Sequence, residues 1–424
     1  MRYSAYDDYQ STKHEWMSIP STWSIMNLSH AVRMKSGENI TSLEISPQGE
    51  YPVYGGNGIR GFYDAYTHSG EFILIGRQGA LCGNIKLVEG EFWASEHAVV
   101  ITADRELIVS WLSYLLASMN LNQYSVSAAQ PGLSVEAIGS LKIPFPSIHE
   151  QQKIAAFLDY KTQQIDQLIE KKKALIEKLN EQRIAVITQA VTKGLDKAAK
   201  MKPSGVDWLG DVPEHWGSRK LKFLTDCALQ YGANEAAVLD DRDLPRFIRI
   251  TDVKDDGSLH DDTFRSLPED IAEPFLLEEG DILLARSGAT VGKSFKYSKS
   301  WGKAAFAGYL IKFSVNKEIM DEDYAYLYFQ SSVFWANINS TLIQSTIQNF
   351  SAEKYANIVQ PLPDLEEQKK IVSYLSASIS KIDKMKNKAQ CVIEKLEEYR
   401  SSLITAAVTG KIDVRNFEII KGVE

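Results

Sequence analysis

Two long amphipathic segments dominate the pattern of apolar and polar positions along the chain. Within each segment, apolar residues recur at steps of three, four and seven, which places them on one stripe of an α-helix. Each segment follows a pair of prolines and then runs for more than 40 residues without glycine or proline. We therefore predict two long helices, over 148–200 and 365–413. The apolar stripes are Ile154, Leu158, Ile165, Leu168, Leu175, Leu179, Val186 and Ile187, and then Ile371, Leu375, Ile382, Met385, Val392, Leu396, Leu403 and Ile404.

The two segments are copies of one another. Each position of Leu141–Asp196 has its counterpart 217 positions later, in Ile358–Asp413, with no gap. Helices of this length are rods of roughly 60 Å, too long to be covered by one small domain. We predict that they pack along each other as a coiled coil; the alternative is two unrelated amphipathic helices, each docked on its own domain. The predicted pairing residues are Ile165, Leu168, Leu175, Leu179, Ile187, Ile382, Met385, Val392, Leu396 and Ile404.

The repeat begins before the helices. Pro-x-x-Trp occurs at 20–23 and 213–216, and an apolar strand followed by Arg-x-Gly-Ala-x-x-Gly occurs at 72–83 and 281–292. A tandem repeat of one α+β module, a globular domain followed by a long helix, is therefore expected. A strand is also predicted at Phe247–Val253, and short helices at Leu112–Met119 and Tyr324–Phe334. The predicted parts are a loosely held lead-in (1–18), a first domain (19–147), the first helix (148–200), a second domain (201–364), the second helix (365–413) and a tail (414–424).

Composition narrows the class of protein. No apolar run reaches the roughly 18 residues that a membrane helix needs, and Met1–Asp8 does not resemble a signal peptide. A soluble, intracellular protein is therefore expected. The 3 cysteines, Cys82, Cys227 and Cys391, are far apart and have no metal-binding spacing, which argues against disulfides and against a zinc site.

Basic residues are concentrated rather than abundant. The net charge is −8, yet 282–317 contains no Asp or Glu while carrying Arg286 and several lysines among aromatic residues. The first half has acid-free stretches at 51–63, a glycine-rich loop, and at 72–88. Positive loops on an acidic body suit a protein that contacts DNA at selected places. The predicted DNA-contacting residues, drawn from these stretches, from 247–253 and from the polar stretches 125–132 and 340–349, are Tyr54, Asn57, Arg60, Arg77, Gln78, Gln130, Arg249, Thr251, Arg286, Ser287, Lys293, Lys296, Gln344, Thr346, Gln348 and Asn349.

No catalytic motif is visible in the sequence. Gly288–Ser294 has three residues between its glycines, where a phosphate-binding loop has four, and the first copy has Asn84 in place of Lys293. The histidines are scattered without metal-ligand spacing, and no Gly-x-Ser-x-Gly elbow occurs. Arg77 and Arg286 therefore have two open interpretations, as parts of a tight turn or as DNA contacts as well.

These residues together resemble the specificity subunits of type I restriction-modification systems. The resemblance rests on both Pro-x-x-Trp phrases, the 51–63 glycine loop, the 280–293 stretch, and Glu-Gln-Gln-Lys-Ile at 150–154 with Glu-Gln-Lys-Lys-Ile at 367–371. It implies two target recognition domains, each reading half of a bipartite double-stranded DNA target, and long helices that pair antiparallel. The first half departs from the pattern, since Gly76 and Gln78 replace Ala285 and Ser287.

The same resemblance implies partners and cofactors. Two methyltransferase subunits would bind this chain, and translocase-endonuclease subunits would complete a cytoplasmic, prokaryotic complex. S-adenosylmethionine and ATP with Mg would belong to those partners, with no cofactor or metal in this chain. Helix length would set the gap between the half-sites. Two alternatives remain open: a single-chain restriction-modification enzyme, which should crosslink S-adenosylmethionine in isolation, and a coiled-coil scaffold, which should show no sequence preference for DNA.

Overall fold

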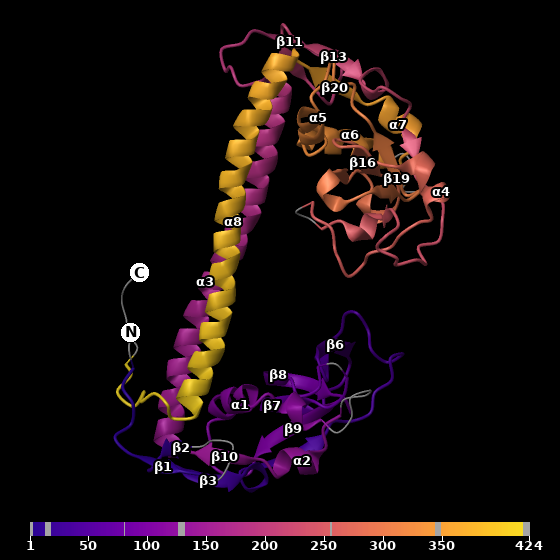
Figure 1. Cartoon of the computed structure of the whole chain (residues 1–424). Helices are drawn as coiled ribbons and strands as arrows, with labels where there is room; N and C mark the ends of the chain where they lie inside the picture. The colour runs from indigo at the N-terminus through magenta and orange to yellow at the C-terminus, as the bar shows by residue number, and fades with distance from the viewer. Residues whose placement is uncertain are drawn as a thin grey trace. The chain divides into compact units, whose positions relative to one another are not determined.

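The structure is a computed structural model that describes residues 3–12, 18–79, 81–125, 132–254, 257–343 and 349–418. It is an α+β fold that divides into two compact units (Figure 1). Unit 1 comprises Met1–Lys173 with Gln390–Glu424, and unit 2 comprises Ala174–Ala389. The two predicted long helices are α3 (Ile148–Lys193) and α8 (Leu365–Val408), and each contributes to both units.

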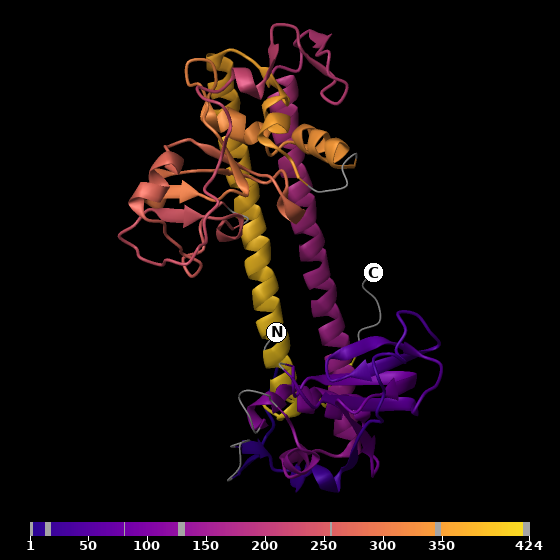
Figure 2. The ribbon, with the colours of Figure 1, turned by 90° about the vertical axis from the view of Figure 1, so that its right-hand side faces the viewer.

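Unit 1 is built on a six-stranded sheet with the order β4-β9-β7-β8-β5-β6. All neighbours are antiparallel except β5 and β8, which run parallel. The sheet lies beside the first part of α3 (Figure 2), and α1 packs between them, since Tyr114 donates to Asp159 of α3. The sheet strands are β4 (Val32–Ser36), β5 (Tyr51–Gly55), β6 (Gly58–Tyr63), β7 (His68–Gly76), β8 (Ile85–Ala94) and β9 (Ala98–Ala103); the helices are η1 (Leu28–His30), α1 (Val109–Ser118), η2 (Leu121–Tyr124) and α2 (Val135–Gly139).

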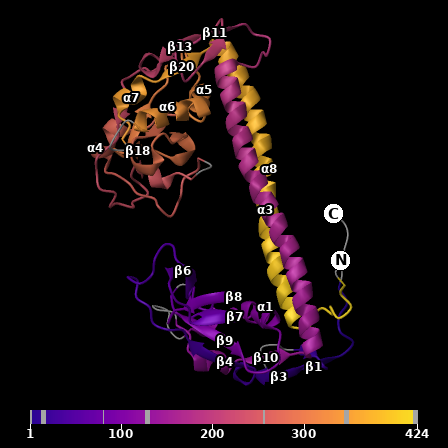
Figure 3. The same cartoon turned by 180° about the vertical axis from the view of Figure 1, so that it is seen from behind.

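Unit 2 has a four-stranded antiparallel sheet with the order β14-β19-β16-β17 and a parallel pair, β15 with β18. α5 and α6 lie beside the end of α3 and the start of α8 (Figure 3), because Tyr324 and Phe334 share one buried core with Ile187 and Ile371. The elements are β14 (Gln230–Tyr231), β15 (Arg246–Ile248), β16 (Ile282–Ala285), β17 (Ser294–Lys296), β18 (Ala304–Phe306), β19 (Leu310–Phe313), η3 (Leu221–Phe223), η4 (Ile250–Asp252), α4 (Glu269–Ala272), η5 (Glu273–Phe275), η6 (Gly288–Thr290), η7 (Lys299–Trp301), α5 (Glu322–Tyr328), α6 (Ser332–Ile343) and α7 (Ala352–Ala356).

Both long helices end earlier than predicted, α3 at Lys193 instead of 200 and α8 at Val408 instead of 413, because Gly194 and Gly410 take positive φ angles just beyond them. Two other predictions also differ from these elements. The predicted strand Phe247–Val253 is a strand only at its beginning, because a 3-10 turn, η4, follows β15 and the Asp252 side chain accepts from the Arg249 backbone N–H at 2.8 Å. The predicted helix Tyr324–Phe334 is two helices, α5 and α6. Ser331 separates them and its hydroxyl donates to the Tyr328 carbonyl at 2.6 Å.

Both units share one framework. In unit 1 β7 lies between β9 and β8, and in unit 2 β16 lies between β19 and β17 in the same way. Gly37 follows β4 and Gly232 follows β14. A Cβ at Gly37 would come within 2.3 Å of the Ala94 carbonyl oxygen at the end of β8, and a Cβ at Gly232 would come within 2.3 Å of the Phe306 carbonyl oxygen at the end of β18. The remaining ladders also correspond: β1 (Tyr9–Ser11) with β2 (Ser18–Pro20) and β3 (Ser24–Asn27) with β10 (Lys142–Phe145) in unit 1, and β11 (Met201–Pro203) with β12 (Asp211–Pro213) and β13 (Gly217–Lys220) with β20 (Val359–Leu362) in unit 2.

The Pro-x-x-Trp phrases hold the first turns of the long helices. The indole N–H of Trp23 donates to Glu150 of α3 at 3.1 Å, and that of Trp216 donates to Glu367 of α8 at 2.9 Å. Both tryptophans are buried. Because Glu150 and Glu367 lie in first turns, their negative charge also suits the positive end of the helix dipole.

Each of these tryptophans also lies close to the C-terminal end of the other long helix. Gly410, just after α8, lies against Pro20 and Trp23, whereas Gly194, just after α3, lies against Trp216. Each unit therefore holds the start of one long helix and the end of the other, so the helices are antiparallel in both units. In unit 1 Arg400 of α8 donates through Nε to Asp166 of α3 at 2.9 Å.

The pairing seam differs from the predicted stripe at four positions. Leu168, Leu175, Met385 and Val392 are exposed, whereas Ile169 and Ile393, each next to one of them, are buried. Apolar residues adjoin at 168–169, 175–176 and 392–393, so their spacing alone is compatible with either choice. The seam follows alternating steps of four and three, as heptad packing requires. Its buried and half-buried members are Leu158, Thr162, Ile165, Ile169, Lys172, Ile176, Leu179 and Arg183 in α3, and their counterparts 217 residues later in α8.

The expected loose lead-in is packed where the structure describes it. Tyr6 is 6% exposed and its ring lies edge-on to Trp23, with centroids 5.7 Å apart. The Tyr9 hydroxyl donates to the Gly410 carbonyl at 2.8 Å. Residues 3–12 thus join the start of the chain to the end of α8, a long-range contact that local composition does not reveal.

Candidate nucleic-acid interface

In unit 1 the candidate site is centred on Arg77, directly after β7. The Arg77 backbone N–H donates to the His97 carbonyl at 2.9 Å, and its carbonyl accepts from Leu133 at 3.0 Å. The guanidinium donates to the Ser36 hydroxyl at 3.1 Å. Gln78 forms a β-bridge with Gly132. We call Ser36, Arg77, Gln78, His97 and Gly132 the Arg77 node.

The stretch 51–63, predicted as a glycine-rich loop, is instead a hairpin of β5 and β6, and its turn lies on this node. A Cβ at Gly56 would come within 3.0 Å of the His97 carbonyl oxygen and 3.5 Å of the Gln78 carbonyl oxygen, so a larger residue would need a small shift of this backbone. At the tip of the same hairpin, the Asn57 amide oxygen accepts from Asn84 at 3.2 Å. Lys86 lies over the Tyr54 ring. The structure therefore brings Tyr54, Asn57, Arg77 and Gln78 together, as predicted candidates of one site. Arg60 is exposed on β6, at the edge of the sheet.

In unit 2 the equivalent centre is Arg286, directly after β16. Its backbone N–H donates to the Tyr309 carbonyl at 3.0 Å and its carbonyl accepts from Phe350 at 2.8 Å. Its guanidinium lies 4.7 Å from the Tyr231 ring centroid and donates to Asn349 and to the Gly308 carbonyl. Ser287 forms a β-bridge with Asn349. We call Tyr231, Arg286, Ser287, Tyr309 and Asn349 the Arg286 node.

Tyr355, from α7, braces the turn after Arg286. Its hydroxyl accepts from the Gly292 N–H at 3.1 Å and donates to the Ala285 carbonyl at 2.6 Å. Burial raises the pKa of this hydroxyl above its ordinary value, so it stays protonated and can keep donating. Gly292 has a positive φ of 88°, which favours glycine at this position. The Arg-x-Gly-Ala-x-x-Gly phrase is therefore a fixed turn that presents the arginine.

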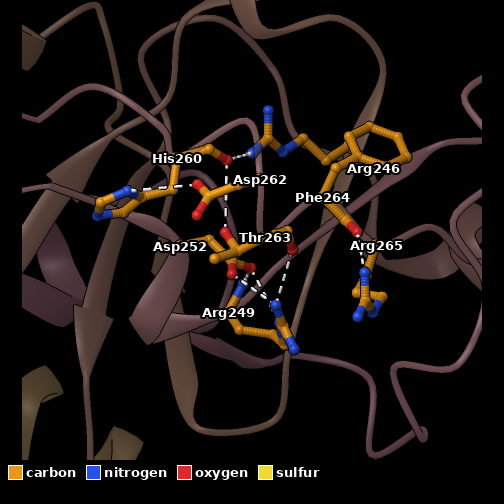
Figure 4. Close-up of polar contacts among 8 residues, drawn as sticks. All are labelled: Arg246, Arg249, Asp252, His260, Asp262, Thr263, Phe264 and Arg265. Carbon is orange, nitrogen blue, oxygen red and sulfur yellow. Dashed lines mark hydrogen bonds and ion pairs between the residues drawn. The ribbon is translucent and has the colours of Figure 1, made fainter. Parts of the chain in front are cut away.

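The Arg249 side chain forms its hydrogen bonds with other residues of unit 2 (Figure 4). Its guanidinium donates to both Asp252 oxygens, at 2.7 and 3.0 Å, and to the Thr263 carbonyl at 2.8 Å. Asp252 is 1% exposed, so this ion pair holds the segment that runs from the end of β15 to Thr263. A DNA contact by Arg249 remains a prediction, but its hydrogen bonds point to a structural role. Thr251, on η4, is exposed.

The acid-free stretch of the sequence is not acid-free on the surface. Lys296 forms an ion pair with Asp323, Lys303 with Glu269 and Lys317 with Glu322. These carboxylates come from segments on either side of 282–317, which a linear window does not see. The positive charge of these three lysines is thereby partly balanced by acidic residues that lie outside the stretch.

Five residues of the two nodes were not predicted from the sequence: Ser36, His97, Gly132, Tyr231 and Tyr309. None of them belongs to a motif, because each reaches its node through strand pairing. Tyr309 did stand out as an aromatic residue within the basic stretch. Gln130, Gln344, Thr346 and Gln348, which were predicted, lie outside the described residues. In the described part of the chain, no group of three or more His, Cys, Asp or Glu could hold a metal ion, and no helix is long and apolar enough to cross a membrane.

Comparisons with known proteins agree with this architecture. A family model described as "Type I restriction modification DNA specificity domain" matches residues 20–178 and 241–395. The chain is 46% identical over 136 residues to the type I restriction enzyme EcoprrI specificity subunit of Escherichia coli, across 31% of this chain and 34% of that one. It is 25% identical over 421 residues to the MjaVIII specificity subunit of Methanocaldococcus jannaschii, across 94% and 95% of the two chains. A structure from a study of complex assembly and conformational transition of the type I R-M system shares the fold, with a TM-score of 0.67, 16% identity and coverage of 93% and 99%.

Proposed function

Because the chain belongs to the family of type I restriction-modification DNA specificity domains, which matches it twice, we propose that it is the DNA sequence-specificity subunit of such a complex. Each unit reads one half of an asymmetric, gapped target in double-stranded DNA. The paired helices set the gap between the halves. The chain itself is proposed to be non-catalytic, with S-adenosylmethionine, ATP and Mg bound by partner subunits.

The observation that carries the proposal is the duplicated node. Each unit presents one arginine directly after the same sheet strand, at the convergence of three segments. The side chains around the two arginines differ, Ser36 and His97 in one node against Tyr231 and Tyr309 in the other. One framework with two sets of contact residues suits the reading of two different half-sites, because base edges are distinguished by the donors and acceptors that meet them.

A repeated patch on the helices supports two copies of a partner. Unit 1 exposes Leu168 of α3 and Val392 of α8, 46% and 39% exposed, and unit 2 exposes their counterparts Met385 and Leu175. These apolar side chains lie outside the pairing seam, so they are available for contact with a partner protein, and we call each such pair of residues a patch. We infer that each patch binds one methyltransferase subunit. Replacing Leu168 and Val392 by Asp should leave one such subunit bound instead of two, as measured by mass photometry, whereas Val238→Asp, at a more exposed position, should leave two.

Methylation mapping tests the function directly. The full chain is expressed with its methyltransferase partner in a host without other modification systems, and the genome is read by single-molecule sequencing. One gapped, asymmetric motif is expected, absent when the gene of this chain is deleted. Methylation without sequence preference would instead favour the coiled-coil scaffold. Methylation by this chain without a partner would favour the single-chain enzyme.

A further inference from the structure

We propose that the residues that hold Arg77 and Arg286, Ser36 and His97 in unit 1 and Tyr231 and Tyr309 in unit 2, determine the base specificity of the two half-sites. Each arginine would meet a guanine edge, and the residue pair beside it would orient the guanidinium and contact the neighbouring base pair. The inference rests on the proposed function and names the positions that carry its specificity.

The equivalence of these positions follows from backbone hydrogen bonds. Gly37 donates to Ala98 as Gly232 donates to Leu310, at 2.9 and 3.3 Å, which equates Ser36 with Tyr231 one residue earlier. Arg77 donates to the His97 carbonyl as Arg286 donates to that of Tyr309. Both units thus place two side chains at the same two backbone positions next to the arginine. The sequence around these positions gives no such alignment, since they fall outside the matching phrases.

Ser36 and Tyr231, which end β4 and β14, hold the guanidinium in two different ways. In unit 1 Ser36 accepts one N–H of Arg77, which fixes an edge of the guanidinium. In unit 2 the guanidinium lies against the Tyr231 ring, a cation–π contact that fixes its face. The Tyr231 hydroxyl accepts from the Ala352 N–H at 2.9 Å and so keeps the ring in place. Because arginine recognises guanine through two parallel N–H groups, the orientation of its plane decides which base it can meet.

Tyr309 and His97, which directly precede β19 and β9, would offer different chemistry to an adjacent base pair. Tyr309 is 64% exposed and presents an aromatic ring and a hydroxyl. His97 has 43% of its side chain exposed, and its ring nitrogens contact the Gln78 amide oxygen at 3.2 Å and the Glu96 carboxylate at 2.9 Å. An aromatic ring can contact a thymine methyl group, whereas an amide beside an imidazole can meet donors and acceptors of a base edge. The two nodes are therefore built for different neighbours of the guanine.

The test exchanges the residues at equivalent positions in the full chain, purified with its methyltransferase partner. The variants are Tyr309→His, Tyr231→Ser and their combination in unit 2, and His97→Tyr in unit 1. Phe223→His is the control, because Phe223 is an exposed aromatic residue of the same unit that lies outside the Arg286 node. Binding is measured by competition between the mapped target and duplexes that carry every single base-pair substitution in both half-sites. Co-purification with the partner and the melting temperature establish that each variant is folded.

The expected result is local. Unit 2 variants should change discrimination at one or two adjacent base pairs of a single half-site by about fivefold to a hundredfold, the range of one base contact, with the other half-site and the gap unchanged. His97→Tyr should do the same in the other half-site. Phe223→His should keep wild-type discrimination. Unchanged discrimination, an equal loss at all base pairs, or a change in both half-sites would overturn the inference; failure of the wild-type complex to prefer any sequence would overturn the proposed function instead.

Discussion

At the scale of single residues, the repeat shows which buried polar groups are needed. Gln151 and Gln368 are 217 residues apart and buried. Their amide oxygens accept from the backbone N–H groups of Ile108, just before α1, at 3.0 Å and of Asp321, just before α5, at 2.8 Å. Each glutamine also donates to the carbonyl of the second proline before its helix. A glutamine in the first turn of either long helix thus connects that helix to α1 or α5. Both glutamines belong to the repeated sequence phrase, and the reason for them appears only in three dimensions.

Gln360 of β20 is the contrary case. It is fully buried, and among the described residues neither of its amide atoms has a hydrogen-bond partner. Its counterpart in β10 is the equally buried Ile143. Since an unpaired buried amide is costly, we expect Gln360→Ile to raise the free energy of unfolding by about 1–3 kcal/mol. Urea unfolding of the two chains measures the difference; a lower stability of the variant would mean that Gln360 does have a partner in solution.

His68 should make unit 1 pH-dependent. It stacks on Phe92, and burial lowers its pKa below the ordinary value of 6.5, with Glu38 opposing and Lys35 reinforcing the shift. As the pH falls, His68 takes up a proton more readily in the unfolded chain than in the folded one. Its contribution to the free energy of unfolding is therefore fully present above pH 6.5 and is lost as the pH falls toward the pKa of the folded chain. We expect the melting temperature to fall less between pH 7.5 and 5 in His68→Gln than in the wild type. Equal pH slopes for the two chains would contradict this.

At the scale of elements, the seam of the long helices was only partly predictable. The 217-residue repeat and the spacing of apolar residues established two long helices, and α3 and α8 begin at equivalent residues, Ile148 and Leu365. Where two apolar residues adjoin, as at Leu168 and Ile169, spacing is compatible with both. The choice depends on the partner helix, since only one of the two positions can point into a hole between its side chains.

This neighbouring pair gives a direct test. Ile169 is 6% exposed and Leu168 is 46% exposed. Ile169→Ala should lower the free energy of unfolding by about 2–4 kcal/mol, because it leaves a cavity in the seam. Leu168→Ala should lower it by less than about 1 kcal/mol. Both variants are compared by urea unfolding of the full chain, and a larger effect at Leu168 would show that the predicted stripe, rather than the observed one, forms the pair.

At the scale of the whole molecule, the antiparallel seam determines how the proposed gap can be changed. Four residues added to one helix would break the alternation of four and three, whereas seven residues added to both, after Ala174 and after Cys391, would preserve it. Seven residues add about 10 Å of helix, or about 3 base pairs at 3.4 Å each. Methylation mapping should then find both half-sites unchanged and the gap about 3 base pairs longer. An unchanged gap would show that helix length does not set it.

The sequence by itself determined the duplicated module, the long helices and the arginine turns, because each depends on local periodicity or on phrases that recur along the chain. Tertiary structure alone decided which apolar positions form the seam, that the lead-in packs on Trp23 and the end of α8, and that lysines of the basic stretch face carboxylates from other segments. It also decided that Tyr231 and Tyr309 meet Arg286, and Ser36 and His97 meet Arg77. These contacts join residues far apart in the chain through strand pairing, and no local pattern records which strands will be neighbours.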